Sequence, residues 1–345
     1  MTGKSNFDIA EAVLLSVLAA LEGVREVRVA LLMKRSVALK VGREFMMTPG
    51  TRSLRFSTID ARRWFGASVE AGLFEMVWEP RSTKPPITEI QLAESLSASR
   101  VTCAGLVNGN FAHDVPAYWD AMSMEASGDD GLVWRQGLKH DAARVLELRV
   151  GPTGLVNGDG EVVDVEPEVL CPLYKSSDIA NVRPPSRVLP LYQFDLSGPD
   201  RLMQKRWPKL AAYLDRHRDV FDARKSKIYA GKDPFMLFGV GKYTSAPFKV
   251  AVSGLYKSPR FSVLRPSNEG APPLVDDTCY LLPFDTRDEA EAVADYLNSP
   301  ETLRFLAAIC DITAKRPYTA AVLRRIKAPA DLRPLTLFSS VGASN

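Results

Sequence analysis

The chain has 345 residues, of which 46% are hydrophobic and 25% charged, the composition of an ordinary globular protein with room for two domains. It has no apolar run long enough to cross a bilayer, and its start lacks the layout of a signal peptide, so we expect a cytoplasmic protein with no membrane partner. The four cysteines and three histidines lie far apart and form no metal-ligand spacing, which argues against a protein-bound metal.

The first part of the chain is predicted to alternate helices and strands. Apolar residues recur at helical spacing after Ser5, which begins a capping-box pattern, so we expect a helix that ends near Gly23. Apolar and β-branched runs then predict a strand at 27–33, a helix around 36–46, and strands at 54–59 and 69–78. This alternation favours an α/β fold.

A charged, proline-rich stretch, EPRSTKPP (79–86), is typical of a domain boundary. We therefore predict an α/β domain at 1–85, a second, mixed α/β domain at 86–330, and a flexible tail at 331–345. Within the second domain the pattern predicts an extended loop at RPPSRVLP near residue 183, an amphipathic helix at 207–226 and a strand, CYLLPF, at 279–284.

Basic residues are concentrated in the second domain. Residues 201–260 hold fourteen Lys and Arg against four Asp and Glu, the charge pattern of a nucleic-acid surface. Three clusters, WRQGLKHD (134–141), RKSKIY (224–229) and AKRPYT (314–319), place cations beside turn residues and hydroxyls, which suits phosphate contacts. The residues expected to contact double-stranded DNA, by base or by phosphate, are Arg135, Lys139, His140, Lys225, Lys227, Lys249, Lys257, Lys315 and Arg316.

Other chemistries find weaker support in the sequence. GVGKYT (239–244) has Thr244 where a dinucleotide fingerprint needs a third glycine, so we expect a strand turn there. The adjacent acids Asp276 and Asp277 could bind a metal in a nuclease, with Glu147-Leu-Arg149 as the nearest companion motif. Two acids at the start of a strand are more often turn residues, and we favour that role here. If they bind a metal instead, the protein would be a metal-dependent nuclease or another DNA-processing protein, which is the alternative function.

The sequence resembles a known family over about residues 3–327. The segments SNFDIAEAVLL, VRVALLMKRSVA and IDARRWFGASVEAGLFEMVWE are similar to adenine-N6 DNA methyltransferases of restriction–modification systems, of the TaqI-like kind. The later segments WRQGLKHDAARVLELR, LYKSSDI, RKSKIY, FGVGKYTSAPFKVAVSGLYK, DDTCYLLPF and AKRPYT are similar to the target-recognition region of one subgroup. The resemblance implies a partial Rossmann-like methyltransferase sheet followed by a mixed α/β DNA target-recognition domain.

The resemblance covers only the C-terminal part of the family's pattern. In the family, an earlier portion carries the S-adenosylmethionine loop and the catalytic signature Asn/Asp-Pro-Pro-aromatic. Here the three Pro-Pro pairs follow Lys84, Arg183 and Ala271, so no residue is assigned a catalytic or cofactor-binding role. S-adenosylmethionine is expected to bind only in a complete enzyme. A separate chain could carry the missing half, or this chain could be an inactive remnant that binds no cofactor.

One family role carries over to this sequence. An aromatic residue before the last strands stacks on the adenine that leaves the duplex, and Phe65 in RRWFGASVEA occupies the matching place. Its neighbour Trp64 could be the stacking ring instead, and Phe65 could instead be an aromatic residue of the core. The expected function is therefore DNA target recognition within a base-flipping adenine methyltransferase, without methylation by this chain alone.

Overall fold

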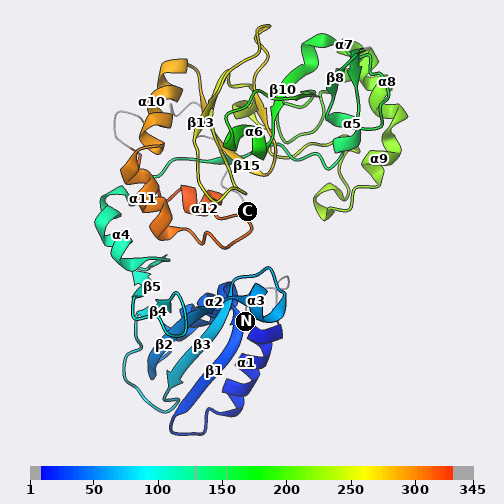
Figure 1. The fold of residues 1–345 in the computed structure, drawn as a ribbon. Coiled ribbons are helices and arrows are strands. Elements are labelled where there is room, and N and C mark those ends of the chain that lie inside the picture. The colour runs from blue at the N-terminus through cyan, green and yellow to red at the C-terminus, as the bar shows by residue number, and fades with distance from the viewer. Residues whose placement is uncertain (1–8, 129, 153, 329–345) are drawn as a thin grey trace. The chain divides into compact units, whose positions relative to one another are not determined.

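The computed structural model describes residues 9–128, 130–152 and 154–328 (Figure 1). The tail predicted at 331–345 and the capping box predicted at Ser5 lie outside the described residues. The chain forms two compact units: unit 1 comprises Met1–Ser123 and Arg304–Lys315, and unit 2 comprises Met124–Leu303 and Arg316–Asn345. The α/β class expected from the sequence is confirmed, since both units combine helices with mixed sheets.

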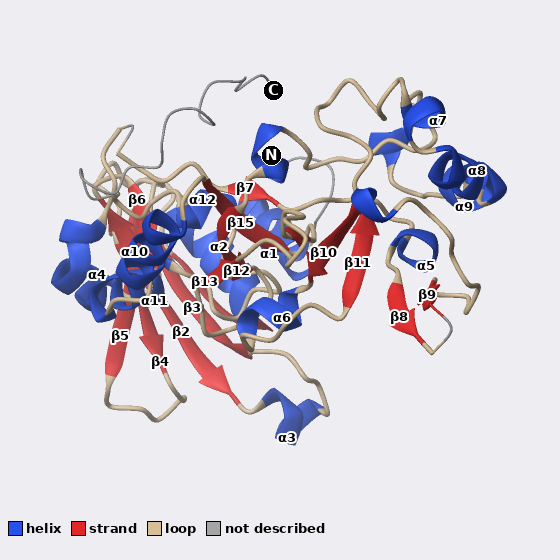
Figure 2. Cartoon of the chain, turned by 90° about the horizontal axis from the view of Figure 1, so that it is seen from above, coloured by secondary structure: helices blue, strands red, loops and turns tan. Residues whose placement is uncertain are grey.

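Unit 1 is built on a six-stranded sheet of order β1-β3-β2-β4-β5-β6, in which Figure 2 shows β2, β3, β4 and β5 side by side. Its elements are α1 (Ile9–Ala20), β1 (Val27–Lys34), α2 (Arg35–Phe45), β2 (Thr51–Ile59), α3 (Ala61–Phe65), β3 (Ala71–Trp78), β4 (Glu89–Ala93), β5 (Val101–Val107), β6 (Asn110–Ala112) and α4 (Val115–Ala121). The helices and strands predicted before residue 79 are all confirmed within a few residues of their expected bounds.

Alternation along the strands directs one face of this sheet to the core. β1 and β3 pair antiparallel, with Val29 opposite Met76 and Leu31 opposite Phe74. Met76 and Phe74 are buried in one cluster with residues of α1 and α2, and the half-buried Val29 and Leu31 pack against it. Since successive strand residues face opposite sides, the residues between them lie on the other face. The two helices therefore cover the apolar face of the β1–β3 pair.

An ion pair joins the two helices of unit 1. Nζ of Lys40 in α2 lies 2.7 Å from Oε2 of Glu11 in α1, and the Glu11 side chain is buried. A buried carboxylate needs such a partner, because desolvation of an unpaired charge costs several kcal/mol, roughly. The pair fixes α1 against α2.

The first compact unit extends beyond the boundary predicted at residue 85. β4 pairs in parallel with β2, through Phe56 opposite Leu92, and β5 and β6 continue the same sheet. The charged, proline-rich stretch at 79–86 is thus a connection within one sheet rather than a gap between compact units. Proline-rich composition marks a break in regular structure, but it does not distinguish a long crossover from a linker.

Unit 2 contains a three-stranded sheet of order β11-β10-β14, a four-stranded sheet of order β13-β12-β15-β7 and the hairpin β8-β9. Its strands are β7 (Arg135–Gln136), β8 (Arg149–Gly151), β9 (Gly154–Val156), β10 (Leu170–Tyr174), β11 (Arg187–Pro190), β12 (Phe248–Ser253), β13 (Ser262–Leu264), β14 (Leu274–Val275) and β15 (Cys279–Phe284). Its helices are α5 (Ala143–Leu146), α6 (Ser176–Ala180), α7 (Met203–Arg206), α8 (Pro208–Arg216), α9 (Arg218–Asp222), α10 (Arg287–Leu297) and α12 (Ala320–Leu323). Helix α11 (Pro300–Ile309) begins in unit 2 and ends in unit 1.

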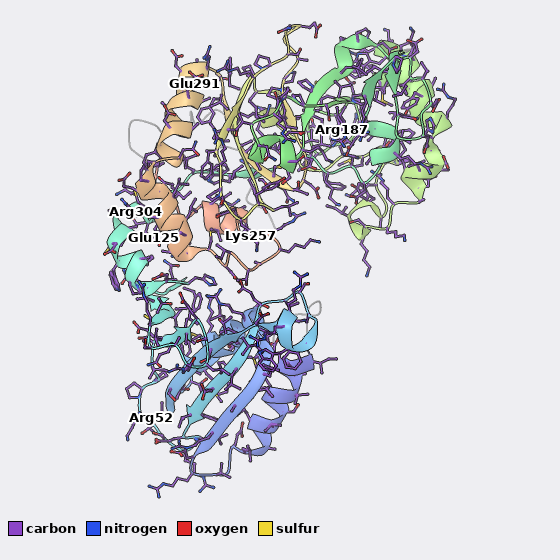
Figure 3. The ribbon with its side chains drawn as sticks, in the orientation of Figure 1. Arg52, Glu125, Arg187, Lys257, Glu291 and Arg304 are labelled. Carbon is purple, nitrogen blue, oxygen red and sulfur yellow. The ribbon has the colours of Figure 1, made fainter. Side chains whose placement is uncertain are left out.

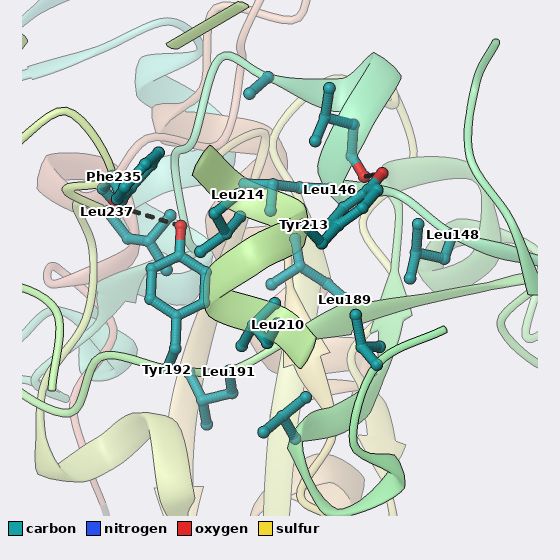
Figure 4. Close-up of a cluster of buried hydrophobic side chains, with 14 of the residues drawn as sticks. Leu146, Leu148, Leu189, Leu191, Tyr192, Leu210, Tyr213, Leu214, Phe235 and Leu237 are labelled. Atoms are coloured by element: carbon teal, nitrogen blue, oxygen red, sulfur yellow. Dashed lines mark hydrogen bonds between the residues drawn. The ribbon is translucent and has the colours of Figure 1, made fainter. Parts of the chain in front are cut away.

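A large buried cluster of unit 2 gathers around α8, whose amphipathic pattern predicted a buried face (Figure 4). Leu210, Tyr213 and Leu214 are all buried, and they recur at the three- and four-residue spacing that puts side chains on one helix face. Tyr192 donates a hydrogen bond to the carbonyl oxygen of Phe235 over 3.0 Å. The cluster thus also satisfies the polar atoms that it buries.

The turn predicted at GVGKYT takes another form. Residues Lys242–Ser245 form a 3₁₀ helix, in which the backbone N–H of Gly241 donates to the hydroxyl of Thr244 over 3.0 Å. The segment leads into β12 but is not itself a hairpin, because Thr244 caps the turn locally. Among the described residues, no helix has the length and apolar character to cross a membrane.

Candidate functional site

A group of buried and half-buried charged side chains lies at one end of the three-stranded sheet of unit 2. Lys175 follows β10, Asp276 follows the parallel strand β14, and Arg187 begins the antiparallel strand β11. The carboxyl end of a strand and the amino end of its antiparallel neighbour meet at the same edge of a sheet. The topology therefore brings these three residues together, although the sequence separates them widely.

Glu147 is the centre of this buried charge cluster. Its Oε1 lies 2.7 Å from Nζ of Lys175, its Oε2 lies 3.1 Å from Nε of Arg187, and Nε2 of His140 lies 3.4 Å from Oε1 (Figure 3 labels Arg187). The backbone N–H of Ala142 donates to Nδ1 of His140 over 3.1 Å, so Nδ1 is the acceptor and Nε2 carries the proton. Each carboxylate oxygen therefore has a cationic or N–H partner.

Electrostatics hold Glu147 and Lys175 in their charged forms. Burial alone would raise the pKa of Glu147, but hydrogen bonds from His140 and Lys175 outweigh it and lower this pKa to about 2. Burial alone would lower the pKa of Lys175, but hydrogen bonds to Asp276 and Glu147 raise it above its usual value. The buried charge cluster is a set of mutually compensated ions.

This geometry disfavours the nuclease alternative built on Asp276 and Asp277. Asp276 is buried, and its carboxylate accepts from the Lys175 ammonium at 2.9 Å and from the Thr278 backbone N–H at 3.1 Å. A cation, Lys175, already bridges Asp276 and Glu147. Within the described ranges, no group of three or more His, Cys, Asp or Glu side chains is arranged to hold a metal ion. The turn role of Asp276, the favoured interpretation of the sequence, agrees with this geometry.

A surface layer of polar residues lies directly above the buried charge cluster. Nζ of Lys139 lies 2.6 Å from Oδ1 of Asp141 and 3.8 Å from Oδ2 of Asp277. The carbonyl oxygen of Asp277 accepts from Nε2 of Gln136 at 2.7 Å and from Nη1 of Arg316 at 3.3 Å. Asp277 thereby joins the first and the third basic clusters of the sequence.

Close backbone packing makes this surface layer possible. A Cβ added to Gly137 would lie 2.1 Å from the carbonyl oxygen of Asp276, so only glycine lets the two backbones approach this closely. The backbone N–H of Leu138 donates to the carbonyl of Val275 over 2.7 Å. WRQGLKHD needs its glycine at this position to bring Lys139 beside Asp277.

The loop that carries Lys257 adjoins the same layer. The Tyr318 hydroxyl donates to the carbonyl oxygen of Lys257 over 2.8 Å, and the Gly254 backbone N–H donates to the carbonyl oxygen of Thr278 over 2.9 Å. Lys257 lies on the connection between β12 and β13, where Figure 3 labels it, and its side chain is exposed. The third basic cluster therefore supports the position of Lys257 through Tyr318.

The second basic cluster, RKSKIY, reaches this layer through Arg224. The guanidinium donates to the backbone carbonyls of His140 at 3.0 Å, Met236 at 2.9 Å and Pro234 at 2.6 Å, and it lies over the Tyr229 ring. Arg224 is thus a structural residue. Lys225 and Lys227, on either side of Ser226, are exposed beside it.

The structure corrects two of the expected DNA contacts. Lys249 is 1% exposed, and its ammonium donates to the carbonyls of Thr244 and Ala246, while burial lowers its pKa to about 7. His140 is buried against Glu147. Lys249 lies on β12, whose residues are buried on both faces of the strand. Both side chains face the interior, so neither can contact DNA in this fold.

The expected contacts Arg135, Lys139, Lys225, Lys227, Lys257 and Arg316 all lie in unit 2, and none of them is buried. Arg135 places its guanidinium 5.5 Å from the centre of the Tyr243 ring. Lys315 is exposed and belongs to unit 1, at the end of the segment Arg304–Lys315. The DNA roles of these residues stay predictions.

The predicted stacking residue lies on a short, well-capped helix of unit 1. Asp60 caps α3 by accepting from the Arg63 backbone N–H at 2.9 Å, and Gly66 ends it with a left-handed φ of 65°. Phe65 is 61% exposed and Trp64 is 67% exposed, so the structure rules out a core role for either ring. The helix presents both rings to solvent.

Several residues that build the site were not singled out from the sequence. The sequence suggests Glu147 only as part of a nuclease motif, and it indicates no separate role for Lys175, Arg187 or Gln136. One signal was available: a charged residue directly before or after a buried strand often lies at the sheet end with its neighbours. The partner strand could not be known from that signal.

The fold of this chain is similar to that of a solved structure. The chain aligns with the solved structure of the type IIL restriction-modification enzyme MmeI in complex with DNA, with a TM-score of 0.52 at 9% sequence identity. The match covers 92% of this chain and 41% of the MmeI chain, so the chain spans less than half the length of that enzyme. At this identity the likeness concerns the fold alone.

A sequence relative defines the family. Type II methyltransferase M.NspV of Nostoc sp. (strain ATCC 29411 / PCC 7524) is 31% identical over 331 residues, which cover 94% of this chain and 67% of that protein. The chain belongs to the type II methyltransferase family. No family profile matches the chain.

Proposed function

We propose that this protein provides the DNA target-recognition part of a site-specific adenine-N6 DNA methyltransferase in a restriction–modification system. The observation that carries the proposal is that residues of three basic clusters, far apart in sequence, are joined in unit 2. Lys139 and Arg316 both contact Asp277, and Arg224 donates to the carbonyl oxygen of His140. Phosphate contacts from Lys and Arg give DNA affinity, and a rigid scaffold gives them a fixed register on the duplex. Membership of the type II methyltransferase family supports the same function.

Methylation would require base flipping, and Phe65 is the proposed stacking residue. A base that leaves the duplex loses its stacking partners, and an exposed ring on a capped helix can replace them. Trp64, which lies beneath the Arg63 guanidinium at 5.5 Å, is the less suitable ring because this cation already covers one side. S-adenosylmethionine would be bound by the cofactor-binding half of the complete enzyme.

Unit 1 offers a surface on which that cofactor-binding half can dock. On α1, Ile9, Val13 and Val17 recur every four residues on one face and are 81%, 50% and 47% exposed. β1 ends the sheet, and among the described strands only β3 pairs with it. An apolar outer helix face beside an open strand edge is typical of a surface that another part of a protein covers. We propose that the occupant is the cofactor-binding half of the methyltransferase, which extends the sheet along β1.

The DNA proposal is tested by binding a DNA duplex at increasing salt. Affinity should fall steeply with salt, because each phosphate contact releases counterions. The double variant Lys225→Ala/Lys227→Ala should reduce the slope of log affinity against log salt by about two, since each phosphate contact contributes close to one. Arg265→Ala, which removes an exposed ion pair with Glu291, is the control. An affinity that does not respond to salt would refute the proposal.

The docking proposal is tested with S-adenosylmethionine. Calorimetry on this chain alone should detect no binding, whereas addition of a cofactor-binding methyltransferase half should produce both a complex and adenine methylation. Val13→Asp/Val17→Asp should abolish the complex while DNA affinity stays unchanged. Tight cofactor binding by the chain alone would contradict the division of roles.

A further inference from the structure

Two loops of unit 2, the loop at 181–186 and the loop that carries Lys257, meet beside the surface layer. The Nδ2 group of Asn181, just after α6, donates to the Ser177 carbonyl at 2.7 Å and to the Tyr256 hydroxyl at 3.4 Å. Tyr256 precedes Lys257, whose carbonyl is held by Tyr318. The loop at 181–186 therefore continues the layer that runs from Lys139 through Asp277 and Arg316.

The loop at 181–186 starts from a firmly anchored helix. The Ser262 hydroxyl donates to the carbonyl of Ile179 over 3.1 Å, and Ile179 is buried in a cluster of apolar residues from the neighbouring strands. Ser176 hydrogen-bonds Ser253 of β12. Lys175, directly before α6, belongs to the buried charge cluster. The start of the loop is thus fixed by apolar packing, hydrogen bonds and ion pairs.

The loop itself is held in an unfavourable backbone conformation. Val182 has a φ of 51°, in the left-handed region that a β-branched residue strongly disfavours. Two backbone hydrogen bonds maintain it, from Val182 to Ile179 at 3.3 Å and from Arg183 to Asp178 at 2.9 Å. Strain of this kind persists where the surroundings impose it and is concentrated at functional sites.

The residues after Val182 restrict the loop further. Pro184 and Pro185 follow Arg183, and a residue before proline is confined to extended conformations. β11 then begins at Arg187, whose side chain is held by Glu147. Arg183 is exposed between the left-handed turn and the proline pair, so its side chain projects from a backbone of little freedom.

We propose that Arg183, supported by Tyr256, reads a base edge and determines part of the DNA target sequence. The inference rests on the proposed DNA function and names a specificity element within it. A guanidinium has a rigid fork of donors that matches O6 and N7 of guanine in the major groove. Reading a base requires a side chain held in register, which the constrained loop provides, whereas a phosphate contact tolerates a flexible lysine.

The test is a selection experiment with the full chain. DNA duplexes that share flanks and contain a randomised central block are bound to wild type and to Arg183→Ala, and the retained sequences are read. Wild type should enrich a motif with at least one guanine. Arg183→Ala should lose the preference at that guanine and bind the best wild-type sequence about tenfold to a hundredfold more weakly, as expected for a lost bidentate contact.

Two matched variants separate base reading from phosphate binding. Lys257→Ala should weaken binding to every sequence alike and leave the motif unchanged. Tyr256→Phe, which removes the hydroxyl that Asn181 contacts, should lower the preference at the same guanine by a smaller factor. Arg265→Ala, away from these loops, should change neither affinity nor motif.

Each outcome decides between the two proposals. If wild type enriches no motif, the proposed target-recognition function fails and this inference fails with it. If wild type enriches a motif that Arg183→Ala keeps, while affinity falls for all sequences, Arg183 binds phosphate and the inference is overturned although the proposed function stands. Loss of the guanine preference without loss of binding to unrelated sequences supports both.

Discussion

The ammonium of Lys175 lies 2.7 Å from a carboxylate oxygen of Glu147, and both side chains are largely removed from solvent. The same ammonium lies 2.9 Å from Asp276, so one lysine compensates two buried carboxylates from different parts of the chain. This relationship ties the buried charge cluster to the surface layer, because Asp276 directly precedes Asp277, the residue that gathers Gln136, Lys139 and Arg316.

Replacing Lys175 by methionine should destabilise unit 2 strongly. Glu147 and Asp276 would keep their burial but lose their shared cation, and breaking a buried pair from one side typically costs about 3–5 kcal/mol. The free energy of unfolding from a urea titration measures this change. Arg265→Met, at an exposed ion pair with Glu291, should alter stability by less than about 1 kcal/mol. A Lys175→Met protein as stable as the wild type would mean that the buried charge cluster contributes nothing.

Glu147 should make stability depend on pH in an acidic window. Its pKa in the folded protein is lowered to about 2 from a usual value of 4.5, so between these values the unfolded chain binds more protons. Its contribution, roughly 3 kcal/mol, is therefore complete above pH 4.5 and lost as the pH falls towards 2. Unfolding free energies measured across this range should fall less steeply in Glu147→Gln than in the wild type. Parallel curves for the two proteins would be the contrary result.

Local patterns in the sequence predicted local structure well. The spacing of Leu210, Tyr213 and Leu214 predicted one buried helix face, and α8 has that face. The single helix predicted at 207–226 is instead divided at His217 into α8 and α9. The expected DNA contact at Lys249 was wrong, because the local excess of basic residues does not show whether a strand is covered on one face or on both. β12 is covered on both faces, so the lysine is buried and bonds to backbone carbonyls instead.

The candidate site was only partly predictable because its contacts are non-local. The sequence identified Lys139 and Arg316 as basic residues in polar turns, but not that Asp277 joins them. That contact depends on how β14, β15 and β7 assemble, and pairing between strands far apart in sequence leaves no short-range signal. Basic composition thus indicated the kind of site, while its arrangement required the fold.

Arg224→Lys should destabilise the protein although lysine keeps the positive charge. Its forked guanidinium donates to carbonyls of His140, Met236 and Pro234 at once, and a single ammonium cannot reach all three in this geometry. Leaving buried carbonyls without donors should cost about 2–3 kcal/mol, measured as a lower free energy of unfolding in Arg224→Lys. Arg144→Lys, at an exposed pair with Asp159, is the matched control and should be nearly neutral.

Arg224→Lys should also weaken DNA binding, because the loop that carries Lys225 and Lys227 loses its attachment to residues 139–141. A variant that keeps both full stability and full DNA affinity would show that the guanidinium contacts are dispensable.

Val182→Gly should separate stability from sequence discrimination. Glycine adopts the left-handed conformation without steric cost, which removes about 1–3 kcal/mol of backbone strain, but it loses about 0.5–1 kcal/mol more conformational entropy on folding. We therefore expect a net gain in the free energy of unfolding. Val182→Ala keeps a Cβ at the same φ of 51° and should lie between valine and glycine.

The stabilised Val182→Gly protein should nevertheless discriminate less well between DNA sequences. Glycine widens the range of backbone conformations ahead of Arg183, so the guanidinium is no longer held in one register. The ratio of affinities for the enriched motif and an unrelated duplex should fall, while the salt dependence of binding stays the same because phosphate contacts are untouched. Gains in both stability and discrimination would mean that the left-handed valine has no role in positioning Arg183.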